Sequence, residues 1–120
     1  MRAWQREERD RRLGIATSVG AAEHRLDQAN AWDEALALHR ACDRDGLAEF
    51  ARRHRIQLFP LLGALERRHH QLGWSLQEQH AAWSAATRRR WAARGLGEQY
   101  DRIFTPRRNN RDNYRGSNSA

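Results

Sequence analysis

The chain contains no lysine, so each of its 22 basic side chains is an arginine. Guanidinium groups are planar, carry five N–H donors and stay charged at any working pH, which suits them to phosphates and flat rings. A GC-rich genome, which favours arginine codons over lysine codons, also accounts for the missing lysine. The net charge of +7 is a separate property, and it indicates an anionic partner.

Cysteine and long apolar runs are equally scarce. The single cysteine, Cys42, excludes a disulfide within the chain. No run of about 18 apolar residues is present, so no transmembrane helix is expected. The first twelve residues are strongly charged and lack the apolar core of a signal peptide. We therefore expect a cytoplasmic protein that does not associate with membranes.

Residues that favour strands are few, with one valine, three isoleucines, three threonines and only two prolines. Alanine, leucine, arginine, glutamate and glutamine are abundant, which is a helical composition. The sequence predicts an all-α fold, a small bundle of four to five helices with a disordered basic C-terminal tail. Residues 1–20 are predicted to form a charged helix and a linker, residues 21–104 the helical domain, and residues 105–120 an Arg/Asn-rich disordered tail.

Apolar spacing and punctuation residues place the helices within residues 21–104. Residues 21–42 form one helix, or two if a new helix begins after Asn30. Residues 43–46 (Asp-Arg-Asp-Gly) predict a turn, and Pro60 suits the first turn of a later helix. Gly73 is placed to end that helix, and Ser75 with Glu78 forms a capping box that opens the next one.

Charge divides unevenly along the chain. Residues 21–46 carry three arginines against six acidic residues, whereas every later segment is basic. Arginines cluster on different predicted helices and in the tail, and together they would form one surface for nucleic acid. The alternative is that each cluster only solvates the outer face of its own helix. The candidate nucleic-acid-binding residues are Arg52, Arg53, Arg55, Arg67, Arg68, Arg88, Arg89, Arg90, Arg107, Arg108 and Arg111.

The segment from Leu47 to Leu72 reads LAEFARRHRI, then QLFP, then LLGALERRHHQL. It resembles a helix-turn-helix unit, with Ala51 at the small-residue position, Ile56 after the turn and Leu61 at an inward position of the second helix. The segment departs from that pattern at Arg55, where a glycine is usual, and in its apolar turn. The resemblance implies that Arg67 and Arg68 lie near DNA. The alternative is an ordinary pair of helices in a bundle.

Two further features point to partners. The tail, TPRRNNRDNYRGSNSA, combines arginines and asparagines for phosphates and base edges with a tyrosine that can stack on a base. Trp83 and Trp91 lie eight residues apart on one helix face, which serves core packing or, where it is exposed, a homodimer or protein partner. In that second hypothesis the protein is a helical interaction module or inhibitor/adaptor in a nucleoprotein assembly. Its acidic 21–46 segment then pairs with the basic helices, within one chain or across a dimer.

Catalytic and metal-binding patterns are lacking. No nucleophile elbow, phosphate-binding glycine loop or His-Glu-x-x-His motif occurs. His54, His69 and His80 lie on predicted inward faces, where a packed core histidine is the usual finding. We therefore expect no cofactor, no metal and no enzymatic activity. The sequence favours a regulatory or accessory protein that binds nucleic acid, DNA rather than RNA.

Overall fold

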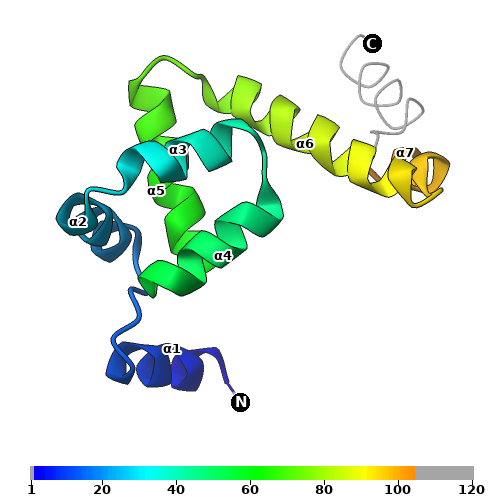
Figure 1. Cartoon of the computed structure of the whole chain (residues 1–120). Coiled ribbons are helices and arrows are strands. Elements are labelled where there is room, and N and C mark those ends of the chain that lie inside the picture. The colour runs from blue at the N-terminus through cyan, green and yellow to red at the C-terminus, as the bar shows by residue number, and fades with distance from the viewer. Residues whose placement is uncertain (1, 105–120) are drawn as a thin grey trace, which may run out of the picture. The chain divides into compact units, whose positions relative to one another are not determined.

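The computed structural model of the protein describes residues 2–104; residue 1, the side chain of residue 7 and residues 105–120 lie outside the described part. Within it, seven helices and no strand are present, which confirms the all-α prediction (Figure 1). The predicted number of four to five helices is wrong, and the predicted disordered tail lies outside the described residues. The helices are α1 (Ala3–Arg12), α2 (Val19–Ala29), α3 (Trp32–Arg40), α4 (Arg44–His54), α5 (Leu58–Gln71), α6 (Leu76–Ala93) and α7 (Gly97–Phe104).

Two local conformations decide where helices begin and end. Asn30 adopts the left-handed conformation (φ 51°, ψ 46°), which an α-helix cannot contain, so residues 21–42 divide into α2 and α3, the second of the two predicted alternatives. The turn predicted at residues 43–46 is instead the start of α4. The Asp43 side chain accepts a hydrogen bond from the Gly46 backbone N–H at 2.9 Å, as an N-cap does.

The chain divides into two units, Met1–Ala82 and Trp83–Ala120, which meet inside α6. No glycine, proline or charge run marks this boundary in the sequence. We refer to them as the first unit and the second unit.

The core of the first unit surrounds α5, which contacts α2, α3 and α4 (Figure 1). Its largest fully buried apolar side chains come from α2, α4 and α5. Burying each of these side chains contributes about 1.5–3 kcal/mol, so this group supplies most of the hydrophobic stabilisation. They are Leu26, Leu47, Phe50, Leu61 and Leu65.

The chain before α2 is anchored at the turn between α4 and α5. Ala16 and Ile56 form an isolated bridge, in which the Ala16 N–H donates to the Arg55 carbonyl at 2.8 Å. The Gln57 N–H donates back to the Ala16 carbonyl at 2.9 Å, and the Gln57 side chain donates to Asp10 at 2.6 Å. The segment of chain before α2 therefore holds this turn in place through these hydrogen bonds.

The described part of the second unit consists of the end of α6 in contact with α7. Arg88 donates two hydrogen bonds to the Asp101 carboxylate, at 2.8 and 2.9 Å. The Tyr100 hydroxyl donates to the Ser84 carbonyl at 3.2 Å. Gly95, with φ +78°, permits the turn between the two helices. No residue of α7 is buried, so polar contacts and partly exposed rings, not a core, hold this pair.

Candidate functional site

The turn between α4 and α5 has the local features that the helix-turn-helix resemblance requires. Arg55, at the position usually held by glycine, adopts φ 56° and ψ 53°, the left-handed conformation that glycine provides most easily. Ala51, Ile56 and Leu61 are all buried. Arg25 stabilises this turn by donating hydrogen bonds to the carbonyls of Gly14 and Arg55, both at 2.8 Å.

The start of α5, which would enter a DNA groove, is an apolar surface flanked by α2. Phe59 is 83% exposed there. Gly63 lies so close to α2 that a Cβ atom added to it would come within 2.9 Å of the Val19 side chain. An apolar helix start beside another helix offers few groups that can read base edges.

The two arginines that the resemblance places near DNA both have partners within the first unit. Arg67 of α5 forms an ion pair with Glu23 of α2 at 3.7 Å. The Arg68 guanidinium lies over the ring of Trp32 in α3, 4.0 Å from the ring centroid. A phosphate would have to compete with these contacts.

The arginines of α4 also have partners within the first unit. Arg52 forms an ion pair with Glu49 of its own helix, and Arg53 with Glu34 of α3 at 2.9 Å. Arg55, just after α4, is exposed. The acidic α2 and α3 therefore offset the basic α4 and α5 within one chain, which is the intramolecular pairing considered in the second hypothesis.

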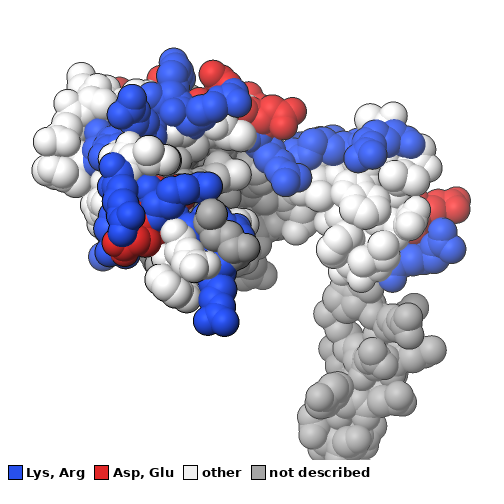
Figure 2. Space-filling view, turned by 90° about the horizontal axis from the view of Figure 1, so that it is seen from below, with Lys and Arg blue, Asp and Glu red and all other residues white. Residues whose placement is uncertain are grey.

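Counting charges by unit shows a sharp asymmetry. The first unit carries thirteen arginines against twelve acidic residues, whereas the second carries nine arginines against three. With histidines neutral, the first unit contributes +1 and the second +6 of the net charge of +7. Figure 2 shows acidic side chains among the arginines of the first unit, and arginines following one another along the second.

The candidate arginines of the second unit differ in the contacts that their guanidinium groups make. Arg88 is held by Asp101, and this hydrogen-bonded pair lowers the pKa of the Asp101 carboxyl. The Arg90 guanidinium donates to the Thr87 hydroxyl at 3.1 Å. Arg89 is exposed, as is Arg94 one helix turn beyond Arg90, and neither forms an ion pair among the described residues. Arg107, Arg108 and Arg111 lie outside the described residues.

An aromatic cluster in the second unit was only partly anticipated from Trp83 and Trp91, both of which are partly exposed. Trp91 of α6 lies edge-on to Tyr100 and Phe104 of α7, with ring centroids 5.6 and 5.8 Å apart. Tyr100 and Phe104 are themselves 4.6 Å apart. The i, i+4 spacing of Tyr100 and Phe104 in a short helix was the available sequence signal.

The inward position predicted for His69 is confirmed, but no sequence pattern predicts its pairing with His39, which forms a buried histidine pair in the first unit. The Nδ1 atoms of His39 in α3 and His69 in α5 lie 2.7 Å apart, so one ring donates and the other accepts. Trp74 packs edge-on against both rings, and the Arg40 guanidinium covers Trp74 at 4.2 Å from the ring centroid. Burial, with a contribution from His69, lowers the pKa of His39 to about 4; burial and the charge of Arg40 lower the pKa of His69.

The other two histidines assigned to inward faces differ from this pair. His54 is half-buried, and its ring lies 4.2 Å from that of Phe50. His80 is exposed, so its inward assignment is wrong; it lies 3.9 Å from the Glu66 carboxylate.

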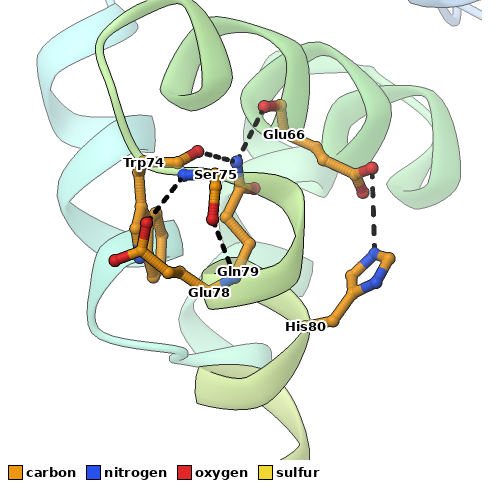
Figure 3. A network of polar contacts seen from close by, with 6 residues as sticks. All are labelled: Glu66, Trp74, Ser75, Glu78, Gln79 and His80. Atoms are coloured by element: carbon orange, nitrogen blue, oxygen red, sulfur yellow. Dashed lines mark hydrogen bonds and ion pairs between the residues drawn. The ribbon is translucent and has the colours of Figure 1, made fainter.

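The junction of α5 and α6 is a polar network, drawn in Figure 3. The predicted capping box is present: the Ser75 hydroxyl accepts from the Glu78 N–H at 3.1 Å, and the Glu78 carboxylate accepts from the Ser75 N–H at 3.2 Å. The buried Gln79 side chain donates to the carbonyls of Glu66 and Trp74, at 3.0 and 2.8 Å. These bonds fix where α6 begins and orient it against the end of α5.

Comparisons of the chain with protein-family models, curated proteins and solved structures found no match. Across the described residues, no helix combines the length and apolarity needed to cross a membrane. In the same part of the chain, no group of three His, Cys, Asp or Glu side chains is placed to hold a metal ion. Function is therefore inferred from geometry and charge alone.

Proposed function

We propose that this protein is a non-catalytic nucleic-acid-binding regulator or accessory factor, with DNA as its more suitable ligand, and that its contacts concentrate in the second unit. The observation that carries the proposal is the charge asymmetry, nine arginines against three acidic residues in the second unit and near balance in the first. Phosphate contacts by clustered arginines supply most of the affinity in such proteins.

The first unit adds less because most of its candidate arginines already have partners. Arg53 and Arg67 would have to leave Glu34 and Glu23 to reach a phosphate, and Arg68 would have to leave Trp32. Arg89 and Arg94 have no such competitor among the described residues. The tail residues Arg107, Arg108 and Arg111 continue the basic run by sequence.

The test is a salt titration of binding by the full chain. Fluorescence anisotropy with duplex DNA, single-stranded DNA and RNA is measured from about 50 to about 150 mM salt. We expect binding of nucleic acid to persist at the upper limit, with log affinity falling linearly with log salt. Loss of binding to all three at physiological salt would overturn the proposal.

A second candidate is the protein-interaction module. The observation that favours it is the exposed apolar surface of α7, where Ile103 is 57% and Phe104 55% exposed. Sedimentation of the full chain tests its homodimeric form. That form predicts the mass of two chains and its loss in a Phe104→Asp variant, and a monomer at every concentration contradicts it.

A further inference from the structure

We propose that the second unit binds single-stranded nucleic acid, stacking unpaired bases on the aromatic cluster of Trp91, Tyr100 and Phe104 while the surrounding arginines hold the phosphates. This inference rests on the proposed function and names the substrate class of the same site. Aromatic platforms beside cationic side chains are the usual means of gripping single strands.

The rings are available to a ligand. The three rings come from two helices and meet at centroid distances of 4.6–5.8 Å, yet no residue of α7 is buried. Phe104 keeps 55% of its surface exposed. An apolar ring left in water is a surface that gains free energy when a base covers it.

The platform is also held in place before any ligand arrives. The two hydrogen bonds from Arg88 to Asp101 and the bond from Tyr100 to the Ser84 carbonyl join α7 to α6. A preorganised platform loses less entropy on binding than one that has to assemble around the ligand.

The positive charge of the second unit favours one kind of ligand for the aromatic cluster. The described part of the second unit has five arginines, Arg88, Arg89, Arg90, Arg94 and Arg102, against the two acidic residues Glu98 and Asp101. A second copy of this chain would bring a unit of charge +6 against another of +6, which opposes a dimer through this face. A polyanion with flat apolar groups matches both the charge and the rings.

The form of nucleic acid follows from the chemistry of stacking. Bases in a duplex are stacked on each other, whereas unpaired bases can lie on protein rings. A duplex reader would instead need a helix that enters a groove. The helix that resembles such an element, α5, has its first turns beside α2 and its arginines held by Glu23 and Trp32.

The experiment compares a single strand with a duplex at about 100 mM salt, using the full chain. The probes are labelled 20-nucleotide oligo(dT), oligo(U) of the same length, and a 20-base-pair DNA duplex. The test variants are Phe104→Ala and Phe104→Leu; the leucine keeps the apolar bulk but removes the flat ring. The control is Phe59→Ala, which removes a phenylalanine of the first unit that is even more exposed than Phe104.

We expect the unaltered chain to bind oligo(dT) or oligo(U) more tightly than the duplex. Both Phe104 variants should weaken single-strand binding by about fivefold or more, with duplex affinity changed by less than about twofold. Phe59→Ala should leave single-strand affinity unchanged. Trp emission should fall when oligo(dT) binds, and this quenching should shrink in Trp91→Phe.

Two results would overturn the inference, and each differs from failure of the proposed function. Binding of duplex and single strand with equal affinity, or full single-strand affinity in both Phe104 variants, means that the contact is electrostatic only; the proposed function then stands and the stacking site does not. Absence of binding to every probe at about 100 mM salt removes the proposed function itself. Unchanged helix content by circular dichroism in the Phe104 variants shows that a loss of affinity is not a loss of fold.

Discussion

The two units use the same residue types in opposite ways. In the first unit, apolar side chains such as Phe50 and Leu61 are fully buried, and arginines pair with acidic residues of neighbouring helices. In the second, the described part buries only Ala86 and keeps its aromatic rings partly exposed, and over the whole unit nine arginines stand against three acidic residues. The first unit has a buried core and a nearly balanced charge, although single apolar side chains such as Phe59 are exposed on it, whereas the second unit has almost no core and a large positive charge.

This difference teaches that arginine content alone does not locate a binding surface. Both units carry arginine clusters, and the candidates on α4 and α5 were as prominent in the sequence as Arg88–Arg90. The structure separates individual arginines by their neighbours: Arg53 and Arg67 form ion pairs with acidic residues of other helices, as Arg88 does with Asp101, whereas Arg89 forms no ion pair among the described residues. Exposed ion pairs contribute little stability, so their main effect in the first unit is to cancel charge.

The largest expected effect comes from matched phenylalanine truncations. Phe50→Ala removes a fully buried ring and should lower the free energy of unfolding by about 3–5 kcal/mol. Phe104→Ala removes a half-exposed ring of the second unit and should change it by no more than about 0.5 kcal/mol. Urea unfolding followed by circular dichroism measures both. Equal losses in the two variants would contradict the contrast between a core and an open platform.

The next effect is a loss of stability in acid that arises in the first unit. The pKa of His39 is about 4 in the folded protein, below its ordinary 6.5, so the unfolded chain binds more protons between these values. The stabilisation is complete above pH 6.5 and is lost as the pH falls towards 4, by up to about 3 kcal/mol at 1.36 kcal/mol per pKa unit. The lowered pKa of His69 acts in the same direction.

Urea unfolding at several pH values between 7 and 4 tests this dependence. The decline should be smaller in a His39→Gln/His69→Gln variant, and it should persist in His70→Gln, which alters an exposed histidine beside the pair. Stability that stays level from pH 6.5 to 4 in the unaltered chain would rule out a neutral, buried histidine pair.

The smallest effect concerns the ion pairs themselves. Arg53→Gln breaks the pair with Glu34, whose two side chains are about half exposed, and should cost less than about 1 kcal/mol. Arg89→Gln, which breaks no ion pair among the described residues, should leave the unfolding midpoint unchanged. A large loss for Arg53→Gln would show that charge pairing holds the first unit together, contrary to the role given to its core.

Local features of the fold were readable from sequence, whereas contacts between distant segments were not. The helical composition, the stop at Gly73 and the Ser75–Glu78 capping box depend on neighbouring residues and are all present. The sequence from Asp43 to Gly46 predicts a turn, because the residue types that favour turns are also those that cap helices. The structure alone shows that Asp43 caps α4.

The candidate binding site, like the fold, depends on contacts between distant segments that the sequence does not predict. Arginine clusters are visible in the sequence, but whether Arg67 meets Glu23, or Arg53 meets Glu34, depends on how α2 to α5 pack. The His39–His69 contact joins residues thirty apart and has no local signal. The sequence therefore named candidate arginines, and packing distinguishes the occupied ones from the available ones.

The most direct test of this account compares two triple substitutions in the full chain, each removing three positive charges. One is Arg89→Gln/Arg90→Gln/Arg94→Gln in the second unit, and the other is Arg52→Gln/Arg53→Gln/Arg67→Gln in the first. Affinity for labelled oligo(dT) is measured as a function of salt. We predict that the second-unit set lowers affinity by about tenfold or more and reduces the salt slope by about 2, and that the first-unit set changes affinity by less than about threefold. Equal losses, or a larger loss from the first-unit set, would contradict the central claim that the second unit carries the binding.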